Sequence, residues 1–173
     1  MRHPLARAVL SIAGLDSALF SRQAILSALE WVAAALPPDC AALWDVAEWR
    51  AFTNDLRFLS GIEAWNEGTA VLIREAVLRV NQAEADLSSQ EKAEDDERRP
   101  APSLATAKRR LDAVRALRRG WEQIQGSAAA WPDSLSWCDW SRLLQQRLEP
   151  LLQRSDDWPR FSTVLDEIAS LTA

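Results

Sequence analysis

The sequence has few of the residues on which most catalytic and metal sites depend. Among its 173 residues His3 is the only histidine, and the two cysteines, Cys40 and Cys138, are far apart. Zinc and non-haem iron sites use several His and Cys ligands, and nucleophilic catalysis usually needs a His or an activated Cys. We therefore expect no metal site and no catalytic residues, and we interpret the cysteines as unpaired, buried side chains that pack like small hydrophobes.

Glycine is also scarce. The five glycines are scattered and form none of the loops that hold phosphates or dinucleotides. Carboxylates are abundant, but none is followed by a histidine three residues later, as di-iron helical bundles require. The sequence thus predicts no cofactor, and we expect that the protein is not an enzyme.

Signals for strands and for membrane segments are missing as well. There is no alternating run of β-branched residues and no Asn-Gly or Asp-Gly turn between apolar runs. No stretch approaches the ~18 apolar residues of a membrane span. The amphipathic run from Leu5 to Ala13 contains Arg7, unlike the apolar core of a signal peptide. We therefore expect an all-α protein of the cytoplasm.

Apolar residues recur at helical spacing along the whole chain. Gly14 can end a first helix, Asp16 or Ser17 can cap a second, and Pro37-Pro38 stops it. Asp39 is the expected N-cap of a third helix. The apolar stripe of that third helix consists of Trp49, Phe52, Leu56 and Leu59.

The longest pattern begins after Gly61 and keeps its phase through Gly68, although an interior glycine costs about 1 kcal/mol relative to Ala. It predicts one helix over residues 62–98. After a Pro-Ala-Pro break, a second heptad-like helix is predicted over 103–125, so the two should form an antiparallel hairpin. The charged segment 88–102 is either a helix that extends into solvent or a disordered loop.

These patterns predict an irregular bundle of about six to seven helices in a single domain over 1–173. Its parts are N-terminal helices in 1–60, the hairpin in 61–126 and tryptophan-rich helices in 133–173. In the last part Trp137 and Trp140 begin an apolar stripe that Pro150 kinks or ends, and Asp156-Asp157 starts a final helix. A heptad-like pattern can pair two helices of one chain or of two chains, so homo-oligomerisation stays open.

Arginines lie close to the apolar face of the 103–125 helix. At about 100° per residue, Arg118 falls between Leu111 and Val114, and Arg110 falls beside Trp121. A cation in such a place pairs with an acid, reaches the edge of the stripe, or contacts a partner. The first alternative predicts an ion pair with a Glu or Asp of the 62–98 helix. The next face carries a basic strip of Lys108, Arg115 and Arg119, which Asp112 interrupts.

Tryptophan is the residue present in excess, with nine copies. Trp31 lies off the buried stripe of its helix, Trp44 is out of phase with Trp49, and Trp131 and Trp158 lie in or beside linkers. Some of these side chains could fill gaps in the core and others could form a docking patch, because Trp and Arg are enriched at binding hot spots. The candidate partner-binding residues are Arg110, Arg115, Arg118, Arg119, Trp121, Trp31 and Trp44.

The missing catalytic groups and the surplus of Trp and Arg favour a non-enzymatic module for protein–protein interaction. It would be an adaptor, an assembly subunit, or an inhibitor or immunity-type partner that binds one or more proteins. The alternative is a small helical subunit of a nucleic-acid-handling complex that contacts the backbone through Lys108–Arg119. A net charge of −5 makes this alternative the weaker one, because nucleic-acid affinity comes mainly from neutralising phosphates.

Overall fold

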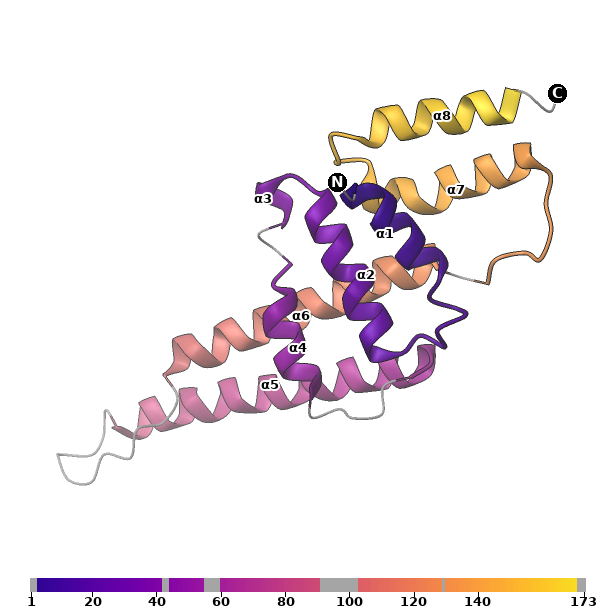
Figure 1. The fold of residues 1–173 in the computed structure, drawn as a ribbon. Helices are drawn as coiled ribbons and strands as arrows, with labels where there is room; N and C mark the ends of the chain where they lie inside the picture. The colour runs from indigo at the N-terminus through magenta and orange to yellow at the C-terminus, as the bar shows by residue number, and fades with distance from the viewer. Residues whose placement is uncertain (1–2, 42–43, 55–59, 91–102, 129, 171–173) are drawn as a thin grey trace.

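The structure, a computed structural model, describes residues 3–41, 44–54, 60–90, 103–128 and 130–170. Over these ranges the chain forms helices and no strands, which confirms the predicted all-α fold and irregular bundle (Figure 1). The helices are α1 (Pro4–Ala13), α2 (Arg22–Ala35), α3 (Pro38–Ala41), α4 (Val46–Asn54), α5 (Ile62–Gln90), α6 (Leu104–Ser127), α7 (Trp137–Leu152) and α8 (Trp158–Ser170). The main pairs are α1 with α2, α5 with α6, and α7 with α8.

The connection between α1 and α2 differs from the expected one. Ser21 caps α2 by accepting the N–H of Ala24, so the predicted caps Asp16 and Ser17 were wrong. The chain first makes a turn in which Leu19 and Phe20 have φ values of 51° and 49°, a conformation that bulky residues rarely adopt. Burial of Phe20 holds this turn in place, and so does the carbonyl of Leu19, which accepts the N–H of Gly61 at 2.9 Å.

The third helix was also predicted wrongly, because the segment forms two helices, α3 and α4. Asp39 lies inside α3, which begins at Pro38, and is not an N-cap. Asp45 begins α4, since its Oδ1 accepts the N–H of Glu48 at 2.9 Å. A short polar side chain of this kind competes with a continuous helix by offering the backbone a local partner. Trp44 lies before this cap and packs against Trp49, with ring centroids 5.8 Å apart. The rest of the predicted stripe, Leu56 and Leu59, lies outside the described residues.

The helical hairpin agrees with the prediction. α5 runs without interruption through Gly68, and Ser103 caps α6. α6 continues to Ser127, so Gly126 belongs to the helix and not to a linker. α5 reaches Gln90, and the predicted continuation of this helix, including most of the 88–102 tip, lies outside the described residues.

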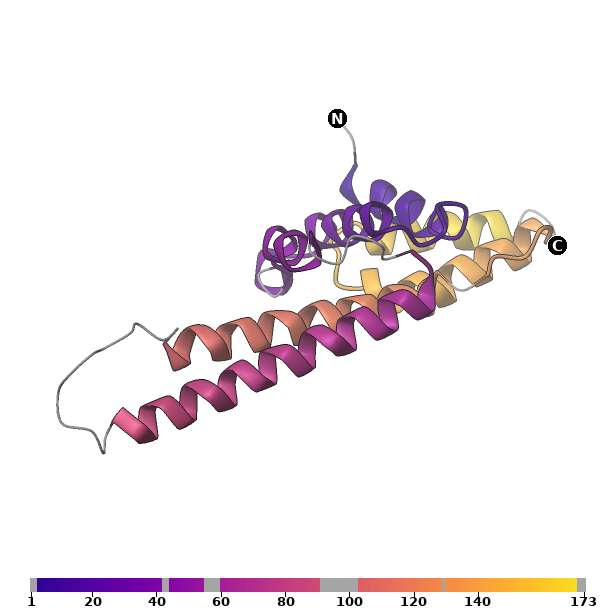
Figure 2. The same cartoon turned by 90° about the horizontal axis from the view of Figure 1, so that it is seen from below.

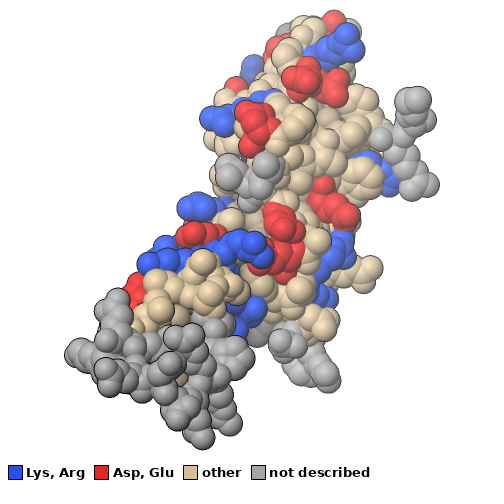
Figure 3. Space-filling view, turned by 90° about the vertical axis from the view of Figure 1, so that its left-hand side faces the viewer, with Lys and Arg blue, Asp and Glu red and all other residues tan. Residues whose placement is uncertain are grey.

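The distal half of the hairpin projects beyond the other helices (Figures 1 and 2). It has a small core of its own, formed by Ala76, Val80, Ala83, Ala107 and Leu111. On the face seen from the hairpin end, Lys and Arg are interspersed with Asp and Glu (Figure 3). The exposed surface of this arm therefore carries charges of both signs.

Three fully buried tryptophans fasten the main core, and the indole N–H of each has an acceptor. Trp49 donates to the carbonyl of Ala113 at 3.1 Å, and Trp65 donates to the carbonyl of Phe20 at 3.0 Å. Trp121 donates to the side chain of Asn66 at 2.8 Å. Each ring removes a large apolar area from water while its polar edge stays satisfied, which accounts for a third of the tryptophans.

The C-terminal pair lies on the opposite side of the bundle from the projecting hairpin (Figure 1). Pro150 lies inside α7, near its end, and α8 begins at Trp158, shortly after the predicted start. In α7 the apolar stripe is buried at Leu148 and Leu151, whereas Trp137 at its first position is 67 % exposed. Within the described ranges, no helix is apolar over a length that would span a membrane.

Candidate functional site

An apolar groove of about 560 Å³ lies between the end of α1 and the α7–α8 pair. We call it the tryptophan groove. α1 and the turn after it contribute Ala13, Asp16 and Ser17, the α6–α7 connection and α7 contribute Trp131, Trp137, Trp140, Ser141 and Leu144, and α8 contributes Leu165 and Ile168. A concave, largely apolar surface with a few polar groups is the usual form of a binding site.

The aromatic wall of the groove is built around Trp131. Its ring stacks on Trp140, with centroids 5.9 Å apart and planes inclined by 24°. The guanidinium of Arg147 lies 4.6 Å from the centroid of Trp131. Trp131 is thus packed against an aromatic ring and a cation, a combination that fixes its orientation. Its buried Nε1 has no acceptor in the part of the chain that the structure describes.

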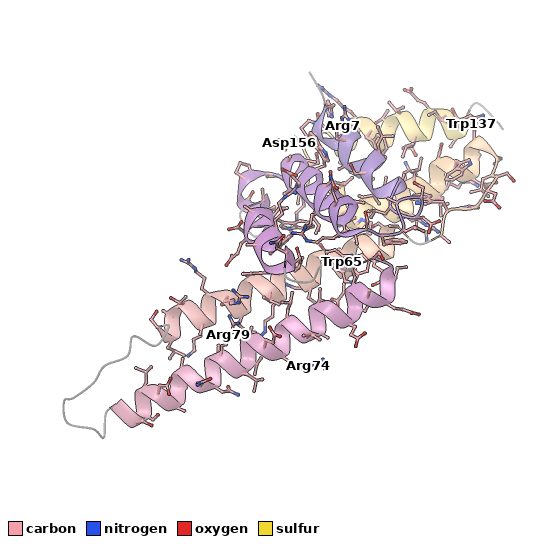
Figure 4. The ribbon with its side chains drawn as sticks, turned by 60° about the horizontal axis from the view of Figure 1, so that its bottom comes forward. Arg7, Trp65, Arg74, Arg79, Trp137 and Asp156 are labelled. Carbon is pink, nitrogen blue, oxygen red and sulfur yellow. The ribbon has the colours of Figure 1, made fainter. Side chains whose placement is uncertain are left out.

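Trp137 supplies the exposed part of the wall. It lies at the first turn of α7, at the far end of the molecule from the projecting hairpin (Figure 4). Three other exposed apolar side chains belong to the elements that form the groove: Leu10 on α1, Leu135 before α7 and Val164 on α8. Leu10 is one turn from Ala13, and Val164 is one turn from Ile168, so the apolar surface extends beyond the groove itself.

Fixed contacts hold the helices that form the walls. Ser136 caps α7, because its Oγ accepts the N–H of Asp139 at 3.1 Å. Gln145 of α7 donates to the carbonyl and the hydroxyl of Ser162 and, at 2.8 Å, to the carboxylate of Asp166, all on α8. Ser127 at the end of α6 donates to the carbonyl of Arg147 at 2.6 Å. These contacts hold the α7–α8 wall of the groove in place, which lowers the entropic cost of binding.

The groove contains a single charged lining residue, Asp16. Its side chain is exposed, and none of the ion pairs found among the described residues includes it. The other polar lining groups are the hydroxyls of Ser17 and Ser141, and Ser141 is buried. A groove lined by one carboxylate and several indole rings has groups that attract a cation.

Arg118, the first arginine that the sequence pattern singled out, is bound within the chain. Its Nη1 donates to the carbonyl of Asn66 and to the hydroxyl of Thr69, each at 2.8 Å, and its Nε donates to Glu122 at 2.5 Å. The expected acidic partner on the long helix was wrong, because the acid belongs to α6 itself. The long helix supplies a carbonyl and a hydroxyl instead, so Arg118 joins α6 to α5.

The other arginine candidates are spread over two faces of α6. Arg110 lies over the ring of Phe52, with 4.6 Å between its guanidinium and the ring centroid. Arg115 is about half exposed and lies 3.9 Å from Asp112. Arg119 is exposed, and no ion pair is seen for it among the described residues. The structure does not bring these three side chains to the tryptophan groove.

The tryptophan candidates contribute mainly to the core. Trp121 is fully buried, so its ring has no free surface for a partner in this fold. Trp31 and Trp44 are partly buried against the main core. The guanidinium of Arg7 lies 6.0 Å from the ring of Trp31. None of the three lines the groove.

None of the groove tryptophans was among the candidate partner-binding residues, although Trp131 was named with the tryptophans that could form a docking patch. The sequence placed Trp137 and Trp140 on an apolar stripe and Trp131 in a linker, and it did not combine them. Three tryptophans within residues 131–140, next to Pro132, are a local concentration that could have identified this region. The sequence does not show that the end of α1 forms the opposite wall of the groove.

Groups for chemistry do not gather elsewhere in the described ranges. There, no cluster of three or more His, Cys, Asp or Glu side chains could hold a metal ion. His3 contacts Asp157 at 3.2 Å, and Cys40 and Cys138 are free and partly buried. No protein-family model, curated protein or solved structure matches the chain. What the protein does must therefore be inferred from its own residues.

Proposed function

We propose that this protein is a non-enzymatic helical interaction module that binds a segment of a partner protein in the tryptophan groove. The observation that carries the proposal is Trp137, whose side chain is 67 % exposed at the mouth of a groove with two further tryptophans in its wall. Contiguous exposed apolar surface is unusual on proteins that act alone, and Trp is among the residues most enriched at binding hot spots.

Rigidity of the groove supports the same proposal. The stack of Trp131 on Trp140 and the hydrogen bonds of Gln145 hold the α7–α8 wall before any partner arrives. A preformed apolar site with few polar groups provides binding energy. The lining contains the hydroxyls of Ser17 and Ser141 but no histidine that could activate them, and no metal cluster is found among the described residues. Adaptors, assembly subunits and inhibitors all need a surface of this type.

The charges of α6 give the nucleic-acid alternative less support than the groove gives to protein binding. Lys108 forms an ion pair with Glu84 at 3.1 Å, and Arg115 lies 3.9 Å from Asp112. These acids reduce the positive potential of the strip that would have to follow a phosphate backbone. Retention on a heparin or DNA column at low salt would favour this alternative, and passage of the protein straight through the column would count against it.

Affinity capture with three baits tests the proposed function. The baits are the wild-type chain, Trp137→Ala and, as a matched control, Leu78→Ala, which removes a similarly exposed side chain (66 %) from the outer side of α5. Proteins are captured from lysate of the source cell, with and without nuclease. A hot-spot tryptophan contributes about 2 kcal/mol or more, so Trp137→Ala should weaken partner binding roughly thirtyfold.

The expected outcome is a stoichiometric protein partner that resists nuclease, binds the Leu78→Ala bait and is lost from the Trp137→Ala bait. A partner that binds Trp137→Ala as well as it binds the wild type would exclude the groove. Capture that disappears with nuclease would favour the nucleic-acid alternative.

A further inference from the structure

The shape and charge of the tryptophan groove define its occupant more narrowly than the proposed function does. Resting on that proposed function, we infer that the groove binds a basic amphipathic helix, with apolar side chains between α1 and α7–α8 and a Lys or Arg at Asp16. Two observations favour a basic occupant. Asp16 places a carboxylate in the otherwise uncharged lining of the groove, and the whole chain carries a net charge of −5.

The walls favour a helix as the occupant. They consist of α1, α7 and α8, and the described residues contain no strand whose edge an extended peptide could join. Helix-in-groove recognition instead needs an apolar channel that takes side chains spaced at i, i+3 or i+4, and i+7. Leu10 and Val164 extend the channel at its two sides, which gives a helix more apolar contact than the groove alone.

The charge favours a basic occupant. Asp16 has no cationic partner in the described part of the chain, and Arg147 is already placed over Trp131 on the inner wall. A cation that enters the groove would be attracted by the carboxylate of Asp16, and the indole rings that line the same groove offer it π faces. An acidic helix would place like charges beside Asp16, which disfavours binding.

Titration with two designed peptides tests this inference. Both have leucines at helical spacing, and their remaining positions are all lysine in one and all glutamate in the other. Binding to the wild-type chain and to three variants is measured by calorimetry at physiological ionic strength. The variants are Trp137→Ala, Asp16→Asn and, as a charge-matched control, Asp112→Asn, which removes the same charge from an exposed residue of α6.

The expected result is that the lysine peptide binds the wild type at least about tenfold more tightly than the glutamate peptide. Asp16→Asn should weaken the lysine peptide about three- to tenfold, and Asp112→Asn should change it less than about twofold. Trp137→Ala should weaken both peptides, because it removes apolar contact and not charge.

Three results would overturn the inference. If Asp16→Asn and Asp112→Asn weaken binding of the lysine peptide equally, only the net charge of the protein matters. In that case, weaker peptide binding by Trp137→Ala would still support the proposed function. Failure of both peptides to bind would exclude a helical occupant, while the capture experiment would still report on the groove. Self-association of the free protein that Trp137→Ala abolishes would identify a second copy of the chain as the occupant.

Discussion

Replacement of Arg118 should destabilise the fold, because this side chain joins the two helices of the hairpin. Two of its three hydrogen bonds cross from α6 to α5, where the carbonyl of Asn66 and the hydroxyl of Thr69 accept at 2.8 Å. The third, to Glu122, stays within α6. A hydrogen bond from a charged donor contributes about 1.5–3 kcal/mol when it is protected from water.

The magnitude follows from exposure and from the acceptors left behind. The side chain of Arg118 is 28 % exposed, so water weakens each bond, and the surface ion pair with Glu122 adds only about 0.3–0.5 kcal/mol. Thr69 keeps its own bond to the carbonyl of Trp65, so removal of the guanidinium leaves no buried donor unsatisfied. Arg118→Met, which retains the apolar stem, should therefore cost about 2 kcal/mol, and Arg118→Lys about half of that.

Urea unfolding followed by tryptophan fluorescence measures these free energies. The control is Arg119→Met, the same substitution at the neighbouring exposed arginine, which should change the free energy of unfolding by less than about 0.5 kcal/mol. If Arg118→Met and Arg119→Met are equally stable, the clamp between α5 and α6 does not exist. Arg118 would then be free to contact a partner, which was one of the alternatives that the sequence pattern left open.

Four other substitutions test the local structure. Ser136→Ala removes the cap of α7 and should lower the free energy of unfolding in urea by about 1 kcal/mol. It should also weaken binding in the groove, because Trp137 lies in the first turn of α7. A loss of binding without a loss of stability would contradict this role of the cap. Leu19→Gly should stabilise the fold by about 0.5 kcal/mol, because relief of a positive φ outweighs the entropy of glycine and the side chain is 74 % exposed; thermal unfolding that starts earlier than in the wild type would refute it. Gly126→Ala should stabilise α6 by about 0.5–1 kcal/mol, since a Cβ there meets nothing within 4 Å. Gly120→Val should instead cost about 1–3 kcal/mol, since a Cβ there lies 3.2 Å from Leu29. Equal stabilities of the two variants would show that α6 does not pack closely on α2.

The hairpin could be predicted because its signal is local and long. α5 keeps its apolar phase over many turns, so a single Gly68 does not obscure it, and Ser103 marks the start of α6. The two incorrect elements are short and depend on contacts that sequence spacing does not show. Leu19 and Phe20 hold left-handed conformations in a turn whose carbonyls accept hydrogen bonds from Gly61, just before α5, and from Trp65 of α5. α4 starts after Asp45 because the side chain of Asp45 caps it.

The sequence could predict what kind of site to expect, but not which residues form the groove. An excess of tryptophan predicts a docking patch, but the same apolar stripe of α7 is covered at Leu148 and open at Trp137. Which end is covered depends on how α7 packs against the other helices, and this is a tertiary property. The position of Asp16 could not be predicted for the same reason, because its sequence context indicated a helix cap whereas its side chain lines the groove.

The most direct test of the groove as the binding surface is fluorine NMR of the chain labelled with 5-fluorotryptophan. Each of the nine tryptophans gives its own resonance, which single Trp→Phe substitutions assign. When the leucine–lysine peptide is added, the signals of Trp131, Trp137 and Trp140 should shift, and those of Trp31 and Trp44 should stay in place. Shifts at Trp31 or Trp44 with Trp137 unchanged would contradict the assignment of the binding surface to the tryptophan groove, whereas no shift at any position would contradict the basic helix as its occupant.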